Sequence, residues 1–245
     1  HNITLTVSDS NGKSSTDDIV YTIGNPSDIG EVIFEEQFNT VDASKWSYTT
    51  GNGCELPSGC GFGNWELQYY NQNNVSVAPI AGEPENNALV IEAKAESMGG
   101  SSFTSGKITS QNKVAVKYGL IEFRMKSPKV ETGLWPAVWM LGVSHPTTGW
   151  PQCGEVDMME MGQKESARKT STEWDLNKPV PAGNDLTAAN VIWYSPNAVS
   201  VDNPIGAASI AYDHWYIQPY HGGGDLSTKF VTYRCYWTDS QIRLT

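Results

Sequence analysis

Three acidic side chains lie within the six-residue motif EVDMME. Glu155 and Asp157 are two residues apart, so on a β-strand both side chains point to the same side. Glu160 has the wrong phase for that side unless one extra residue, at Met158 or Met159, forms a β-bulge. With such a bulge, the motif predicts three carboxylates in a row on one face of an otherwise apolar strand.

A row of carboxylates on one strand is unfavourable unless it is used, because like charges repel and raise one another's pKa. Retaining glycoside hydrolysis uses such a pair: one ionised carboxylate attacks the anomeric carbon, and one protonated carboxyl group, about 5–5.5 Å away, releases the leaving sugar. The outer two glutamates are roughly 13 Å apart along the strand, so their side chains must lean together across a concave sheet. Asp157 between them would hydrogen-bond the nucleophile and keep the two pKa values apart. The alternative is an edge strand whose charges face water.

The aromatic composition also suits a sugar-binding protein. Nine Trp and eleven Tyr occur beside only six Phe, and Trp and Tyr combine an apolar face with a polar edge. Trp135, Trp139 and Trp150 flank the acidic motif, and Trp135 and Trp139, in GLWPAVWMLG, are candidate platforms for sugar rings. A large sheet core would use some of these aromatic residues as well.

The hydrophobic pattern predicts an all-β sandwich. Short runs of strand type alternate with Gly, Pro and Asn turns, and no long stretch has a 3.6-residue period. In YGLIEFRMKS, Ile121, Phe123 and Met125 share one face. Residues 162–225 are polar and poorly patterned, so we expect unplaced strands or cleft-lining loops there. The predicted strands are EVIFEEQF, NVSVAPI, ALVIEAKA, KITSQNKVAV, YGLIEFRMKS, AVWMLGV, EVDMMEM, VIWYS and FVTYRCYWT.

The first part of the chain differs from the rest. Residues 1–23 contain ITLTVSD and DDIVYTI around the turn SNGKSS, which predicts a β-hairpin. This stretch resembles the end of a polycystic-kidney-disease-type immunoglobulin-like module, and we interpret it as the remnant of an accessory module. Residues 24–30, with GNPS, are expected to form a linker. Residues 31–245 would then be one catalytic domain.

The acidic motif and the blocks around it resemble glycoside hydrolase family 16, particularly its bacterial laminarinase-like endo-β-1,3-glucanases. The family motif E-[apolar]-D-x-x-E stands here as residues 155–160. The supporting blocks, in the same order, are FGNWELQYYN, SGKITS, YGLIEFRMKSP, GLWPAVWMLG and WPQCGEVDMME. The resemblance implies a β-jelly roll of two curved antiparallel sheets with a concave substrate cleft. It also implies that Glu155 is the nucleophile, Asp157 its assisting residue and Glu160 the acid/base in the hydrolysis of β-1,3-glucan (laminarin).

The same resemblance implies residues that bind the substrate: Asn64 and Glu66 on the glycone side of the cleft, Trp135, Trp139 and Trp150 as stacking residues, and Arg124. The chain departs from the family pattern in three places. Leu120 stands where a cleft arginine is customary. The customary cleft histidine corresponds to Ile192 or Trp193, with His214 as a candidate replacement. The chain stops at QIRLT, so we expect the C-terminal strands of both sheets to be missing.

Composition and motifs argue against several other functions. The net charge of −11 and the lack of a basic run disfavour nucleic acid, and no apolar run is long enough to span a membrane. No zinc, phosphate-binding, dinucleotide or nucleophile-elbow motif occurs. We therefore expect no cofactor, although a structural calcium, found in family members, has no assigned ligands here. The expected protein is a secreted or cell-surface monomer whose partner is a polysaccharide.

The four cysteines fall into two groups. Cys54 and Cys60, in CELPSGC, could close a small disulfide loop. Cys153 and Cys235 lie in apolar surroundings and are predicted to be buried thiols.

Two alternative functions remain open from the sequence. A non-hydrolytic β-glucan-binding protein on the same fold would typically have lost one or both glutamates, and here all three acids are present. A related endo-hydrolase could act on a marine galactan (agarose, porphyran or carrageenan), which the acidic composition and Leu120 disfavour. One acting on mixed-linkage glucan would more typically have the unbulged motif E-x-D-x-E.

Overall fold

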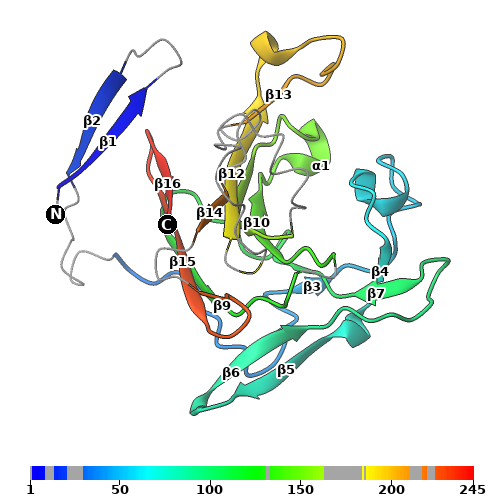
Figure 1. Ribbon diagram of the computed structural model, residues 1–245. Helices are drawn as coiled ribbons and strands as arrows, with labels where there is room; N and C mark the ends of the chain where they lie inside the picture. Colours follow the sequence, from blue (N-terminus) through cyan, green and yellow to red (C-terminus); the bar gives the residue numbers. More distant parts are fainter. Residues whose placement is uncertain are drawn as a thin grey trace. The chain divides into compact units, whose positions relative to one another are not determined.

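The structure is a computed structural model that describes residues 2–8, 14–20, 30–130, 133–162, 184, 186–209, 217–219 and 224–245 (Figure 1). The chain divides into two compact units, His1–Glu35 and Glu36–Thr245.

The first unit contains the predicted hairpin. Strands β1 (Asn2–Ser8) and β2 (Ser14–Val20) pair antiparallel, with Ile3 opposite Ile19, which confirms the predicted β-hairpin. The predicted strand EVIFEEQF is wrong, because residues 31–38 form no strand. Val32 and Ile33 are 69% and 75% exposed, and Phe38 stacks on the ring of Trp46 (5.9 Å between centroids).

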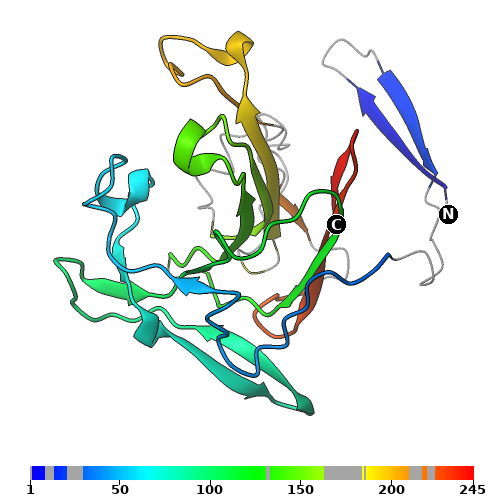
Figure 2. The same cartoon turned by 180° about the vertical axis from the view of Figure 1, so that it is seen from behind.

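One layer of the second unit is a five-stranded antiparallel sheet (Figures 1 and 2). Its strands are β10 (Ala137–Leu141), β11 (Glu155–Glu160), β12 (Leu186–Tyr194), β13 (Ala207–Ser209) and β14 (Ile217–Pro219). They run in the order β10-β11-β12-β13, and β14 pairs with β12. The last three strands come from the poorly patterned stretch. Strand β12 contains all but the last residue of the predicted run VIWYS, and β13 and β14 confirm that unplaced strands lie there as well.

The other layer is a three-stranded antiparallel sheet of β9 (Gly119–Met125), β15 (Val231–Trp237) and β16 (Ile242–Leu244), in the order β16-β15-β9. The seven residues of β9 pair with the seven of β15 without a shift in register. The predicted apolar face of β9 is confirmed, because its alternate side chains Ile121 and Phe123 pack against the buried core.

The core lies between these two sheets, and β11 contributes to both of its clusters. Before the middle of the strand, Val156 and Met158 pack with Cys235 of β15. After it, Met159 and Met161, both fully buried, pack with Val231 and Tyr233 of β15 and with other apolar side chains. The apolar side of the acidic strand is therefore what joins the two layers.

In the described residues of the second unit, three smaller strand pairs and four short helical turns accompany the two sheets. The pairs are β3 (Ser47–Tyr48) with β8 (Ile108–Thr109), β4 (Gln68–Tyr70) with β7 (Phe103–Ser105), and β5 (Val75–Ile80) with β6 (Glu83–Ile91). The turns are η2 (Cys60–Gly63), η3 (Gln72–Asn74), α1 (His145–Thr148) and η5 (Pro196–Ala198).

The strand pairs confirm an all-β architecture, with two differences from the expected pattern. Strands β4 and β7 are parallel, which is possible because the hairpin β5–β6 forms the crossover that parallel strands need. The predicted strand KITSQNKVAV is reduced to the two residues of β8. Within the described ranges, no helix is long and apolar enough to cross a membrane.

The position of Met159 predicts its effect on stability. Met159→Ala should lower the free energy of unfolding by about 2–5 kcal/mol, because it leaves a cavity where the two sheets meet. Urea unfolding followed by tryptophan fluorescence measures this change. Val201→Ala, at a side chain that is 96% exposed, is the control and should change stability by less than about 0.5 kcal/mol. Equal effects from the two substitutions would contradict this account of the core.

Candidate active site

A β-bulge in β11 places the three acidic residues. Along the pairing with β10, Val138 lies opposite Met159 and Trp139 lies opposite Asp157, so Met158 is the extra residue. The pairing of β11 with β12 shifts over the same residues. The bulge predicted from the phase of the acids is therefore confirmed at Met158.

The bulge puts the acids and the core residues on opposite sides of the strand. Met158 and Met159, on either side of the shift, are both buried in the core. Glu160 returns to the face of Glu155 and Asp157, where Asp157 is only 3% exposed and the two glutamates are half-buried. The structure thus brings the three predicted catalytic residues together on one sheet face.

Two tryptophan indoles hold the outer glutamates. Nε1 of Trp150 donates a hydrogen bond to Oε2 of Glu155 (2.6 Å), and Nε1 of Trp135 donates one to Oε1 of Glu160 (2.9 Å). Both indole rings remain more than a third exposed. Sequence reasoning identified these residues as sugar platforms and missed that each one also orients a carboxylate.

The segment before β10 approaches the end of β11 closely, and a glycine makes that approach possible. The Met161 N–H donates to the Pro136 carbonyl (3.1 Å). A Cβ on Gly162, whose φ is +113°, would lie 2.4 Å from the Leu134 carbonyl oxygen and 3.2 Å from the Trp135 ring. A larger residue at 162 would therefore push Trp135 away from its carboxylate.

Burial and crowding bias two of the acids toward their protonated forms. Burial, the charges of Glu160 and Glu155, and a side-chain hydrogen bond with Glu155 raise the pKa of Asp157 to about 9. Burial and the charge of Glu155 also raise the pKa of Glu160, against the hydrogen bond from Trp135. The protonated form of Asp157 is therefore favoured, and its proton can be shared with Glu155 through their hydrogen bond.

Lys107, immediately before β8, places a positive charge beside this acidic face. Its Nζ atom lies 4.7 Å from the centroid of the Trp139 ring and 5.6 Å from those of Phe62 and Tyr70, in the range of cation–π contacts. Burial lowers the pKa of Lys107, while the charges of Glu66 and Glu155 oppose that effect. Sequence reasoning missed this residue. The block SGKITS marked the position, but the contacts depend on tertiary structure.

Glu66 belongs to the same cluster. Its Oε2 atom accepts hydrogen bonds from Oη of Tyr70 (2.7 Å) and Nε2 of Gln68 (2.6 Å). The Tyr70 ring in turn lies against the ammonium group of Lys107. The predicted substrate residue Glu66 is thus linked to the acidic strand through Tyr70 and Lys107.

Comparison with known proteins agrees with this arrangement. A family model described as "XgeA-like, catalytic GH16 domain" matches residues 61–174, a span that includes all of β11. The laminarinase of Flavobacterium sp. UMI-01 has 30% sequence identity and a TM-score of 0.58, over 88% of this chain and 74% of that one. The chain belongs to glycoside hydrolase family 16.

Two further family relatives extend the comparison. The laminarinase catalytic domain of Thermotoga maritima has 27% identity and a TM-score of 0.63 over 88% of this chain and 73% of that one, so the packed sheets are a family 16 β-jelly roll. "Glucan endo-1,3-beta-glucosidase A1" of Niallia circulans is 32% identical over 205 residues. That alignment covers 72% of this chain and 29% of the Niallia protein, so this chain spans less than a third of that relative's length.

Among the other residues expected from the family, Asn64 and Arg124 have different surroundings. Asn64 is exposed at the end of η2, two residues before Glu66. Arg124 lies on β9, in the other sheet, where its guanidinium donates to both carboxylate oxygens of Glu83 (2.8 and 2.6 Å) and lies 4.6 Å from the Phe230 ring. The structure does not bring Arg124 to the acidic strand, and its part in substrate binding remains a prediction.

The positions that depart from the family pattern can also be located. Ile192 lies on β12 directly opposite Glu155, so an apolar side chain is the cross-strand neighbour of that carboxylate. The next residue, Trp193, is 42% exposed. Leu120 lies on β9 opposite Tyr236 of β15. His214, the candidate replacement for the customary histidine, lies outside the described residues.

The predictions about the cysteines and about a bound metal can also be compared with the structure. Cys54 and Cys60 form the predicted disulfide, Cys235 is fully buried as predicted, and Cys153 is half-buried. In the part of the chain that the structure describes, no three His, Cys, Asp or Glu side chains gather as a metal site would require. The possible structural calcium remains a prediction.

The raised pKa of Asp157 predicts how stability depends on pH. Its pKa in the folded protein, about 9, exceeds the ordinary value of 3.8. Between these two pH values the folded protein keeps a proton that the unfolded chain releases. The stability due to this proton is complete below the ordinary pKa and is lost as pH rises toward 9. Asp157→Asn is neutral at every pH. The Tm of the variant minus that of the wild type should therefore be larger at pH 8 than at pH 5.

Differential scanning fluorimetry at the two pH values measures this difference. Asp202→Asn changes an exposed carboxylate outside β11 and is the matched control. It should give the same Tm difference at both pH values. Equal differences for Asp157→Asn as well would mean that Asp157 is ionised in the folded protein.

Proposed function

We propose that the protein is a retaining endo-glycosidase that hydrolyses β-1,3-glucan (laminarin) by double displacement. The observation that carries this proposal is the bulged strand β11, on which two indole-held glutamates flank a buried aspartic acid. The names of the relatives, laminarinases and a glucan endo-1,3-β-glucosidase, support the substrate.

In the first step, Glu155 attacks the anomeric carbon of the sugar on one side of the scissile bond. Glu160 donates its proton to the glycosidic oxygen as the bond to that oxygen breaks, which releases the first product with a free hydroxyl group. Burial raises the pKa of Glu160 and so favours the protonated form that this step needs. The glycosyl group is then covalently bound to Glu155.

In the second step, Glu160 acts as a base. It removes a proton from a water molecule, and the resulting hydroxide attacks the anomeric carbon from the face that the leaving group vacated. The bond to Glu155 breaks, the carboxylate is regenerated and Glu160 again carries a proton. Two inversions at the same carbon give net retention of configuration.

The surrounding side chains prepare Glu155 and Glu160 for these roles. The proton on Asp157 stabilises negative charge on Glu155 when it leaves the sugar. The indoles of Trp150 and Trp135 hold the two carboxylates in place before substrate binds. Lys107 offsets part of the repulsion within the acidic row.

The setting of this activity is part of the proposal. The disulfide between Cys54 and Cys60 suits an oxidising environment, and polymeric glucan must be cut where it occurs, outside the cell. We propose a secreted or cell-surface enzyme that acts as a monomer, with residues 1–23 as part of an accessory module and residues 31–245 as the catalytic part.

Loss of either glutamate should abolish hydrolysis. Glu155→Gln and Glu160→Gln should each lower kcat on laminarin at least about a hundredfold, since one removes the nucleophile and the other the proton donor. Reducing-sugar release from laminarin, lichenan, agarose and porphyran, assayed side by side, measures both the loss and the substrate class. Glu122→Gln is the matched control, because Glu122 lies on β9 in a surface pair with Arg234 (2.6 Å) and should leave release unchanged.

Two outcomes would overturn this proposal. Full activity in either glutamine variant would remove the assigned roles, and release from agarose or porphyran alone would replace the substrate. NMR of the first product made by the wild type gives an independent check. An inverted anomer would exclude double displacement.

The charge of Lys107 should set the acidic side of the pH profile. Lys107→Met removes the charge and keeps the length of the side chain, so ionised carboxylates nearby become less favourable. The acidic limb of the kcat/KM profile should then move upward by about one pH unit. Lys107→Arg keeps the charge and should keep the wild-type limb. A rise in KM with no movement of the limb would show that Lys107 only contacts substrate.

A further inference from the structure

The most exposed aromatic side chain of the described residues has no part in the mechanism above. Trp65 is 90% exposed, although burying a tryptophan is strongly favourable. Its φ of +60° lies in the left-handed region that non-glycine residues rarely adopt, and Phe62 in the same loop has a φ of +55°. Such conformations persist only where the surroundings enforce them, and they gather at ligand sites.

The loop that carries Trp65 is closed on itself. The disulfide joins Cys54 to Cys60, at the start of η2. The Gly61 carbonyl then accepts hydrogen bonds from the N–H groups of Asn64 (2.8 Å) and Glu66 (3.3 Å), the two neighbours of Trp65. A Cβ on Gly61 would lie 2.7 Å from the Glu66 nitrogen, so only glycine permits this return of the chain.

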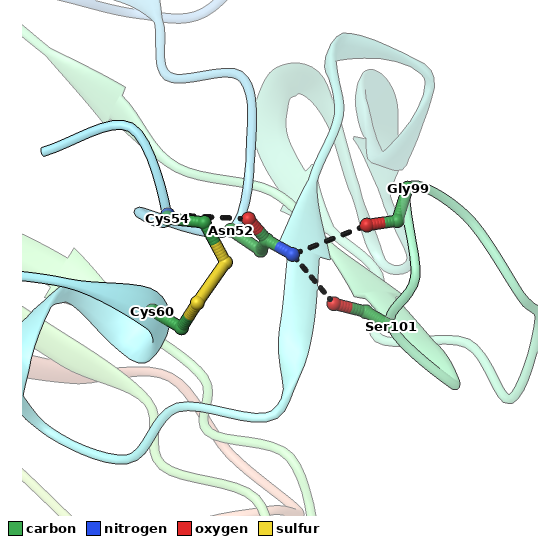
Figure 3. Close-up of a disulfide and its surroundings, with 5 residues drawn as sticks. All are labelled: Asn52, Cys54, Cys60, Gly99 and Ser101. Carbon is green, nitrogen blue, oxygen red and sulfur yellow. Dashed lines mark hydrogen bonds between the residues drawn. A yellow bond between two sulfur atoms is a disulfide. The ribbon is translucent and has the colours of Figure 1, made fainter.

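The same loop is fixed to the body of the domain beside the disulfide. Figure 3 shows that Nδ2 of Asn52 donates to the Gly99 carbonyl (3.2 Å) and to Oγ of Ser101 (3.4 Å). The Oδ1 atom of the same side chain accepts from the Cys54 N–H (3.3 Å). Trp65 therefore projects into solvent from a loop with two attachments. One is the disulfide between Cys54 and Cys60, and the other is the set of Asn52 hydrogen bonds beside Cys54.

A chain of contacts connects this loop to the acidic strand. Glu66, next to Trp65, accepts a hydrogen bond from Tyr70, and the Tyr70 ring lies against Lys107. Lys107 in turn lies on the ring of Trp139, which is opposite Asp157 in the sheet. In both views the segment with η2 rises from β4 toward the end of the domain where α1 lies (Figures 1 and 2).

We propose that Trp65 is a sugar-stacking platform that binds the glucan chain beyond the units held at Glu155 and Glu160. This inference rests on the proposed function. The occupant is a glucan because its rings present apolar faces and hydroxyl edges, which match an exposed indole between the polar Asn64 and Glu66. The chain on both sides of Trp65 is held by hydrogen bonds to the Gly61 carbonyl, next to the disulfide. Such a segment loses little conformational entropy when the glucan stacks on it, so the contact contributes most of its energy to binding.

Binding measurements separate this platform from the catalytic residues. We would titrate the full chain carrying Glu155→Gln with laminari-oligosaccharides of increasing length by calorimetry, with and without Trp65→Ala. The Kd for long oligosaccharides should rise about three- to tenfold in the Trp65→Ala protein, the loss of one aromatic contact, while the Kd for the disaccharide changes less than twofold. Trp65→Phe should restore most of the affinity, and Val201→Ala is the exposed apolar control.

Removing the disulfide gives a second test of the proposal. Replacing Cys54 and Cys60 together by serine should weaken binding of long oligosaccharides when Trp65 is present and have no further effect in the Trp65→Ala protein. Additive losses would mean that the loop does not act through Trp65, which would overturn the proposal.

The remaining outcomes distinguish a failure of the Trp65 platform from a failure of the proposed function. Equal affinity at every length with and without Trp65 overturns this inference alone. A concentration-dependent dimer in sedimentation that Trp65→Ala abolishes would make a second copy of the chain the occupant instead. No binding of any laminari-oligosaccharide would overturn the proposed substrate, and the platform with it.

Discussion

One extra residue in a strand, Met158, is the constraint on which the rest of the structure depends. A regular strand could not bury four apolar side chains and present three acids on the other side with this spacing, because side chains alternate strictly. The bulge lets Met158 and its successor Met159 both face the core. The strand can then join the two sheets and still return Glu160 to the face of Glu155. The catalytic geometry and the packing of the domain thus have one structural origin.

The second constraint is electrostatic. Three acids on one face, half-buried or buried, would repel one another if all were ionised. The protein resolves this with a proton on Asp157 and with a cation, Lys107, held against aromatic rings. The indoles of Trp135 and Trp150 add one donor to each outer glutamate. Each of these groups lowers the cost of the crowding, which the proposed division of roles between Glu155 and Glu160 requires.

Much of this arrangement could be predicted from the sequence, because its cause is local. The spacing of the acids requires a bulge near Met158, and alternation places Ile121 and Phe123 on a buried face; both predictions are confirmed. What failed depends on contacts between distant segments. The apolar run at 31–38 predicted a strand, and the structure has none there, because a strand also needs a partner that the run itself does not specify. The contacts of Lys107 and the pairing of Arg124 with Glu83 are tertiary, so no local pattern could reveal them.

The candidate site consists of one strand and the segments that surround it. In the proposed function, the strand carries the acids that react and the surrounding segments carry most of the groups that select the substrate. All three acids lie on β11, fixed by hydrogen bonds to β10 and β12. Of the three tryptophans expected to stack on sugar, Trp135 and Trp150 lie outside strands, before β10 and after α1, and Trp139 lies on β10. Residues in such segments can change without disturbing the sheet. The two positions predicted to replace the customary histidine, Ile192 and Trp193, are different, because both lie within the sheet on β12. Ile192 is directly opposite Glu155, so a change there would alter the immediate surroundings of that carboxylate.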